Sequence, residues 1–261
     1  MEIIGYVLAI IIGITLGLIG SGGSILTIPV LVYLYQIPPT QATAYSLFIV
    51  GAVALMGSLK GLKQKLVSLK IAFFFGFPSI ISIFIMRKWL MPLFPDVFFT
   101  IGEWVVSKEL FIMIIFSILM IIASTSMINA KSTGTAEENE LKPPKLILPG
   151  FIIGFLTGFV GVGGGFLIIP SLVFKAKLPM RKAVATSLLI ISVNALIGFT
   201  GSLGTVPIAW NFLLIFTGFA LIGIFIGSAL SLKIKGEKLK PFFGWFVLIT
   251  GIYILIRELW F

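Results

Sequence analysis

The sequence predicts an all-α polytopic membrane protein, and its hydropathy and charge distribution carry that prediction. Of the 261 residues, 59% are hydrophobic and 11% are charged, and the mean hydropathy is +1.18. Soluble domains average about 45–50% apolar and about 25% charged residues. Three long runs, 3–59, 146–174 and 183–232, contain no charged residue. Because a bilayer crossing needs roughly 20 apolar residues, each run can hold one or more transmembrane helices.

Two of the expected helical segments are interrupted by glycine. The first covers about 3–35 and is broken at 20–23, and the second covers about 146–175 and is broken at 161–165. Uninterrupted helices are expected in the other apolar stretches, at about 40–60, 67–88, 108–130, 182–203, 208–233 and 240–260. Residues 131–145 are polar and rich in charge, so they predict an exposed connector too short for a soluble domain.

The chain is an internal duplication. A shift of 141 residues aligns 12–57 with 153–198, and 20 of the 46 aligned positions are identical. The matches include the glycines of both breaks and the prolines that follow them, Pro29 and Pro170. Shared hydrophobicity cannot place glycines and prolines so consistently. We therefore expect a first transmembrane repeat at 1–130, the connector at 131–145 and a second repeat at 146–261.

The positive charges discriminate between two topologies. After each break about 10–12 apolar residues remain, which can complete a broken crossing or fold back as a re-entrant hairpin. If both segments fold back, fifteen Lys and Arg residues share one face, and four lie on the other: Arg87, Lys88, Lys108 and Arg257. Full crossings would abolish this bias, so the positive-inside rule favours hairpins. Each repeat then has one hairpin and three transmembrane helices. Since that is an odd number of crossings, the repeats are inverted, the connector is cytoplasmic and both termini lie outside.

The glycine breaks are candidate anion sites. A half-helix that begins inside the membrane presents backbone N–H groups and the positive end of its dipole, and glycine lets a ligand approach them closely. The expected donors come from both repeats: Gly22, Gly23, Ser24, Gly163, Gly164 and Gly165. The alternative is that these glycines only permit close helix packing. Their density and their duplication in register favour the anion site.

A few polar side chains extend the candidate site. Ser46 and Ser187 occupy equivalent positions early in the helix after each hairpin, beside Thr186, and Asn194 is the only amide expected in a helix core. Hydroxyl groups also bond to their own helix without any further role. The adjacent residues Arg181 and Lys182 can draw an anion to the cytoplasmic mouth, although such residues more commonly set orientation and meet lipid headgroups.

The composition argues against several other classes of protein. The chain has no Cys and no His, so no thiolate metal site is available and no metal or cofactor is expected. The apolar runs also hold no paired acid and base for catalysis, which argues against an enzyme. The net charge of +10 lies at the ends of apolar segments, where it orients a membrane protein rather than binding nucleic acid. The oligomeric state stays open between monomer and homodimer.

The paired motifs resemble the TauE/SafE family of membrane permeases over essentially the whole chain. The segment GFVGVGGGFLIIPSLV with AVATSLLIISVNALIG is echoed as GLIGSGGSILTIPVLV with ATAYSLFIVGAVALMG. The resemblance implies export of sulfite, sulfoacetate or a related organosulfonate across a bacterial inner membrane. It places the family's glycine motif on 161–165 and its Ala-Thr-Ser on 185–187. Ser24 and Tyr45 depart from that pattern, and if both repeats contact substrate these departures shift its identity.

The expected mechanism is an anion uniport. With the cell interior negative, moving one negative charge outward gains about 2.3 kcal/mol per 100 mV, so no coupling ion is required. The expected site lies near the midplane, between two repeats that rock around it. The competing hypothesis is a membrane-embedded accessory or scaffold protein that transports nothing.

Overall fold

The computed structural model describes residues 2–19, 21–101, 104–128, 143–230 and 236–260. Most of them are helical, as the sequence predicts. The first half contains α1 (Glu2–Ile19), η1 (Ser21–Leu26), α2 (Thr27–Pro29), η2 (Val30–Leu34), α3 (Pro39–Lys63), α4 (Leu69–Ile85), η3 (Met86–Leu90), α5 (Met91–Leu93), β1 (Val97–Ile101), β2 (Trp104–Ser107) and α6 (Lys108–Ile128). The second half contains η4 (Pro143–Leu146), α7 (Ile147–Val160), α8 (Gly165–Phe174), α9 (Met180–Ser202), α10 (Trp210–Leu230) and α11 (Gly236–Trp260). Residues 131–142, most of the expected connector, lie outside the described part.

Several helices are long and apolar enough to cross a membrane. Within the described residues these are Pro39–Lys63, Leu69–Leu93, Lys108–Thr125, Arg181–Ser202 and Trp210–Leu230. Their outward faces carry large exposed hydrophobic side chains, including Phe73, Phe77, Ile222 and Phe225. Water would penalise such surfaces, whereas lipid tails would not. The chain is therefore a multi-pass membrane protein.

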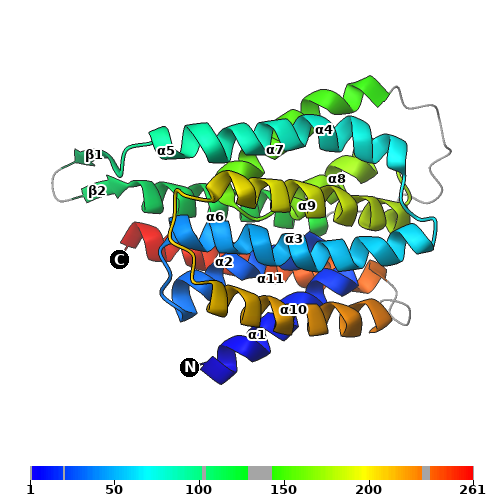
Figure 1. The fold of residues 1–261 in the computed structure, drawn as a ribbon, viewed down its shortest axis with the longest axis horizontal. Helices are drawn as coiled ribbons and strands as arrows, with labels where there is room; N and C mark the ends of the chain where they lie inside the picture. Colours follow the sequence, from blue (N-terminus) through cyan, green and yellow to red (C-terminus); the bar gives the residue numbers. More distant parts are fainter. Residues whose placement is uncertain (1, 20, 102–103, 129–142, 231–235, 261) are drawn as a thin grey trace.

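The stretch after Arg87 departs from the all-α expectation. The helix α4 continues through η3 and α5 as far as Leu93, and β1 and β2 then form a short antiparallel hairpin. Figure 1 shows this hairpin projecting from one end of the molecule. Strands can occur there because their outer backbone groups meet water rather than lipid.

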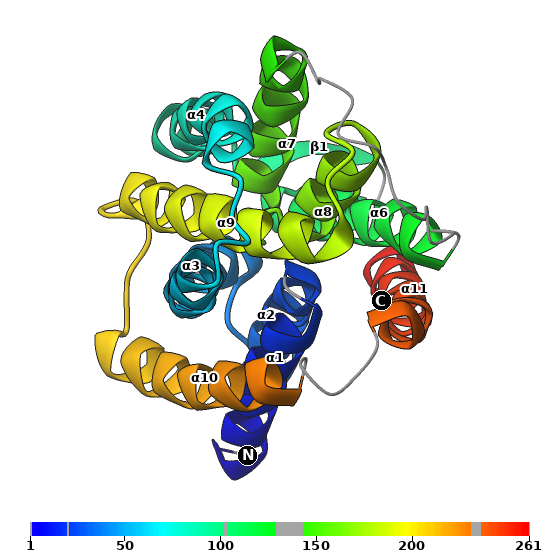
Figure 2. The same ribbon diagram turned by 90° about the vertical axis from the view of Figure 1, so that its right-hand side faces the viewer.

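Two antiparallel helices, α3 and α9, form the centre of the molecule. Figure 1 shows that they run in opposite directions, and Figure 2 shows α4 and α7 on one side of the pair and α1 and α10 on the other. The helices α6 and α11 pack together at a third side. The connection between α3 and α4 lies at one end, and that between α9 and α10 lies at the opposite end.

Both helix interruptions lie where the glycines predict them. The helix α7 ends at Val160, and α8 begins at Gly165 after a turn of left-handed residues. In the first half α1 ends at Ile19, residue 20 lies outside the described part, and the 3₁₀-helix η1 begins at Ser21.

The duplication extends to contacts between the two halves. The backbone of Gly13 on α1 touches the Ala220 carbonyl on α10, and that of Gly154 on α7 touches the Ser79 carbonyl on α4, so neither glycine has room for a side chain. Both members of the first pair are displaced by 141 residues from those of the second. Each broken segment therefore packs against a helix of the other half.

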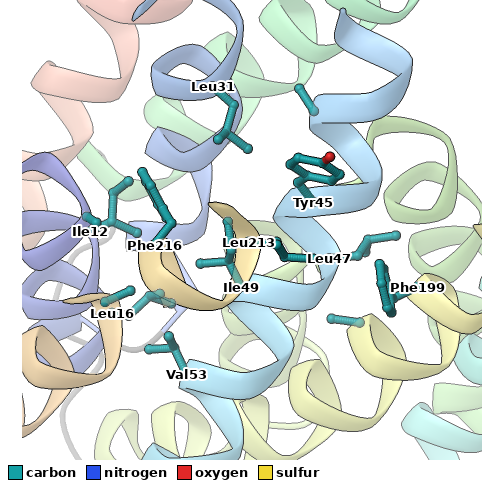
Figure 3. Packing of buried hydrophobic residues seen from close by; sticks show 14 of the residues in the cluster. Ile12, Leu16, Leu31, Tyr45, Leu47, Ile49, Val53, Phe199, Leu213 and Phe216 are labelled. Carbon is teal, nitrogen blue, oxygen red and sulfur yellow. The ribbon is translucent and has the colours of Figure 1, made fainter. Parts of the chain in front are cut away.

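The hydrophobic core also combines side chains from both halves of the chain. One cluster joins Ile12 and Leu16 of α1 to Val53 of α3 and to Leu213 and Phe216 of α10, all of them buried (Figure 3). Side chains from both halves fill it at close range. Neither half therefore encloses a core of its own.

Candidate functional site

The second glycine break lies half-way along the two central helices. A Cβ on Gly163 would lie 3.1 Å from Val50 Cγ1 and 3.2 Å from Ile191 Cγ2. Val50 is the twelfth of 25 residues in α3, and Ile191 is the twelfth of 23 in α9. The turn is therefore close to the middle of the spans that these helices make.

Glycine is required for the shape of this turn. The φ angles of Gly161, Gly163 and Gly164 are +79°, +65° and +77°, in the left-handed region that other residues rarely adopt. The amide of Gly161 ends α7 by donating to the Thr157 carbonyl at 2.8 Å. The first turn of α8 begins inside the protein, because all of residues 161–165 are buried.

The first-turn amides of α8 make an electropositive position in the core. The amide of Ile168 donates to the Gly164 carbonyl at 3.0 Å, which is the first regular bond of α8. The Leu167 amide donates to the same carbonyl at 3.0 Å. The helix dipole is positive at this end of α8, so the first turn favours a negative ligand. The arrangement is chemically able to hold a small anion without any metal.

The two broken segments adjoin one another. The helix η1, which contains Gly22, Gly23 and Ser24, contacts α8. Ile25 of η1 and Val162 of the second break belong to one buried cluster. The structure therefore brings the predicted glycine positions of both halves into one region.

Ser46 and Ser187 differ despite their equivalent positions. Both are fully buried. The Ser187 hydroxyl donates to the Val184 carbonyl of its own helix at 2.8 Å, whereas the Ser46 hydroxyl has no hydrogen-bond partner within the described chain. Buried hydroxyl groups are rarely left unpaired, so Ser46 is the stronger candidate for a ligand contact.

Thr186 has a structural bond. Its Oγ1 accepts from the backbone amide of Ser68, at the start of α4, at 3.0 Å. Tyr45, the equivalent residue in the first half, accepts at its hydroxyl from the amide of Ala209 at 2.6 Å and from Gln41 Nε2 at 2.8 Å. The departure of Tyr45 from threonine therefore preserves a bond to the backbone.

Asn194 is buried and half satisfied. Its Nδ2 donates to Ser79 Oγ on α4 at 2.6 Å, and its Oδ1 has no partner among the described residues. An amide in a helix core needs such a bond across to a neighbour. Asn194 therefore ties α9 to α4 and still has one polar atom to offer.

Arg181 and Lys182 lie away from the glycine breaks. They stand at the start of α9, nine and ten residues before Ile191, which corresponds to about 15 Å along a helix. Arg181 is exposed and Lys182 is half-buried. The two residues share the end of the molecule that carries the α3–α4 connection (Figure 1).

Arg87 is a buried cation, although the charge pattern of the sequence assigns it to the outer face. That assignment misses its environment, because Arg87 is only 3% exposed. Its Nη1 donates to Thr43 Oγ1 at 3.0 Å, and its Nη2 lies against Gly161. The apolar stretch Trp89–Leu93 that follows Arg87 and Lys88 is the available signal, since it extends the span beyond both charges.

The fold defines a multi-pass membrane protein, and comparison with known proteins identifies it as a membrane transporter. A model of the family described as "Sulfite exporter TauE/SafE" matches residues 6–254, so the chain belongs to this family. It is 26% identical over 255 residues to a "Probable membrane transporter protein" of Xylella fastidiosa, covering 95% of this chain and 92% of that one. It is 30% identical over 248 residues to "Probable membrane transporter protein MJ0441" of Methanocaldococcus jannaschii, covering 90% and 87%. No solved structure matches it.

Proposed function

We propose that the protein exports a small sulfur oxyanion, such as sulfite, sulfoacetate or a related organosulfonate, from the cytoplasm across a bacterial inner membrane. The observation that carries the proposal is the buried turn at 161–165, in which a half-helix begins mid-span beside η1. Membership of a family described by sulfite export supports the substrate class.

The proposed topology has two inverted repeats, 1–130 and 146–261, each with a re-entrant hairpin and three transmembrane helices. The opposite directions of α3 and α9 support it (Figure 1). Matched contacts support it too: a Cβ on Gly57 would lie 2.9 Å from Ile224 Cδ1, and one on Gly198 would lie 2.9 Å from Ile83 Cδ1. Inverted repeats with broken helices are a common plan of secondary transporters.

The proposed site takes its amide donors from both breaks. The proposed positions are Gly163, Gly164 and Gly165 at the start of α8, and Gly22, Gly23 and Ser24 in the 3₁₀-helix η1. Ser46 adds a hydroxyl that has no other bond within the described residues. The Ser187 hydroxyl already donates within its own helix and joins the site only by exchanging that bond. Thr186 accepts a hydrogen bond and keeps its own O–H to donate, and Asn194 keeps the second N–H of its amide group. Arg181 and Lys182 serve the cytoplasmic mouth by attracting anions.

The proposed energy source is the membrane potential. An interior-negative potential drives an anion outward by about 2.3 kcal/mol per charge per 100 mV. The moving units in this mechanism combine both repeats, because α1 packs on α10 and α7 packs on α4. We therefore propose that these two mixed units, rather than the two halves of the chain, rock around the site.

Efflux from proteoliposomes tests this function. Vesicles loaded with sulfite or sulfoacetate and held at an interior-negative potential are expected to release the anion faster than protein-free vesicles. Efflux at zero potential that requires a proton or sodium gradient would contradict the uniport. If folded protein releases none of these anions under any gradient, the scaffold hypothesis replaces transport.

A further inference from the structure

We propose that the Arg87 guanidinium supplies the positive charge that holds the transported anion beside the second glycine break. This inference rests on the proposed function and adds a side chain to its site. It also specifies the ligand class, an oxyanion group with a single negative charge, since Arg87 is the one fully buried cation among the residues whose burial the structure describes.

Arg87 lies well inside a membrane-spanning segment. It precedes the end of the span Leu69–Leu93 by six residues, about 9 Å along a helix, and its side chain is buried. Its neighbour Lys88 is exposed. A long cationic side chain near a helix end normally extends to the membrane surface. Arg87 instead turns into the protein.

The guanidinium has unused donors in that position. Nη1 donates to Thr43 Oγ1, and the Thr43 hydroxyl in turn donates to the Thr40 carbonyl at 2.7 Å. Nε and Nη2 have no hydrogen-bond partner in the described part of the chain, and no carboxylate there pairs with Arg87. An unpaired buried charge is costly, so an anionic ligand is the partner that would stabilise it.

One of the unused donors, Nη2, lies at the break. Nη2 lies so close to Gly161 that a Cβ at that position would collide with it, and the Cβ of Arg87 lies 3.0 Å from where a Cβ on Gly201 would stand. Glycine on both sides therefore admits the arginine. Gly161 leads directly into the turn that begins α8, so the guanidinium and the α8 amides border the same segment.

The donor geometry of arginine suits the proposed substrates. A guanidinium presents paired N–H groups in one plane, which match two oxygens on one central atom. Sulfite and the sulfonate group both offer such a pair. One cation with one helix N-terminus balances a single negative charge, which favours a sulfonate or hydrogensulfite over a multiply charged ion.

The second half of the chain carries no equivalent of Arg87. Residue 228, its counterpart in the duplication, is Ser228, and its backbone carbonyl accepts a hydrogen bond from Lys60 Nζ at 3.2 Å. Lys60 is half-buried at the end of α3. Lys60 is the counterpart of Gly201 in the duplication, so the contact between Lys60 and Ser228 matches that between Gly201 and Arg87. Each of these two contacts contains one cation, but only Arg87 is fully buried.

The test is stabilisation of the purified full chain by sulfite, measured as a shift of its melting temperature. Sulfite is expected to stabilise the wild type and the matched control Lys88→Gln at similar concentrations. Arg87→Gln is expected to need about 10- to 100-fold more sulfite, because it loses charge-assisted hydrogen bonds. Arg87→Lys keeps the charge and is expected to fall between them. Without sulfite, Arg87→Gln is expected to be as stable as the wild type, since it removes a buried unpaired charge.

Equal stabilisation of Arg87→Gln and the wild type would overturn the inference. Should Arg87→Gln not fold, Thr43→Val is the substitute test. This variant removes the acceptor of Arg87 Nη1, so it is expected to change the sulfite concentration that stabilises the protein. A response to sulfite equal to that of the wild type would count against Arg87. Efflux assays separate the two proposals. Sulfite export by wild type and by folded Arg87→Gln at equal rates removes only the role of Arg87, whereas a wild type that neither binds nor exports sulfite removes both.

Discussion

Tyr45 and Thr186 stand 141 positions apart and make the same bond at two ends of the molecule. Each accepts a hydrogen bond from a backbone amide of the other half that directly precedes a helix: Ala209 before α10 for Tyr45, and Ser68 before α4 for Thr186. These amides are also 141 positions apart. A phenol and a short hydroxyl thus reach equivalent targets. The difference in size between the two side chains therefore gives no reason to expect a different substrate.

Removing either acceptor is expected to destabilise the protein, and Tyr45→Phe is expected to keep the anion preference of the wild type. Tyr45→Phe and Thr186→Val each leave a backbone amide unpaired, which costs about 1–3 kcal/mol. Thermal unfolding is expected to show the loss in both variants, while the order of preference of Tyr45→Phe among sulfite, sulfoacetate and sulfate stays as in the wild type. Thr200→Val is the control, because the Thr200 residue is exposed and its hydroxyl bonds within its own helix. A changed anion order in Tyr45→Phe would place this residue at the substrate after all.

Two glycines of α10 are expected to respond oppositely to alanine. Gly223 touches the Ile10 carbonyl of α1, so Gly223→Ala forces the helices apart and lowers the melting temperature. A methyl group added at Gly218 would have no neighbouring atom within 4 Å, so Gly218→Ala is expected to keep or raise stability, by up to about 1 kcal/mol. Equal effects of both substitutions would contradict the close approach of α1 and α10.

Substitution of Ser46 is expected to slow transport more than substitution of Ser58, another serine of the same helix. Ser46→Ala removes a buried hydroxyl without a partner among the described residues, and we expect a reduction of sulfite efflux by about three- to tenfold. Ser58→Ala is the control, because Ser58 is equally buried but bonds to the Leu55 carbonyl. Efflux from Ser46→Ala at the wild-type rate would exclude this hydroxyl from the site.

The absence of native cysteine makes the topology directly measurable. Gln64 lies exposed in the α3–α4 connection and Thr205 lies exposed in the α9–α10 connection. In intact cells a membrane-impermeant maleimide is expected to label Thr205→Cys and to label Gln64→Cys only after the membrane is opened. The reverse pattern would place the basic end of the molecule outside and reject the positive-inside orientation.

The second break could be predicted from the sequence because glycine at 161, 163 and 164 has one dominant reason to cluster there. A left-handed turn inside an apolar run requires it, and φ is +79°, +65° and +77° at these three positions. The helix boundaries followed from hydropathy for a similar reason: only continuous helices or barrels satisfy the backbone in lipid. Both the glycine break and the helix boundaries therefore depend on residues that are close together in the sequence.

The partners of the helices could not be predicted in the same way. Nothing in the composition of α1 indicates that it packs on α10, because lipid-facing and protein-facing surfaces are equally apolar. The environment of Arg87 could not be predicted for a related reason. Its neighbour Lys88 carries the same charge, and only tertiary packing against Thr43 and Gly161 sends one side chain inward and the other outward.

The pairing of α1 with α10 also sets an order for biosynthesis. Between Ile19 at the end of α1 and Trp210 at the start of α10 the ribosome adds about 190 residues, which takes about 10–40 s at 5–20 residues per second. During that interval the face of α1 that carries Gly13 and Gly17 lacks its native partner α10, and other membrane components can occupy it. The nascent first half therefore cannot complete its own packing until α10 has been synthesised.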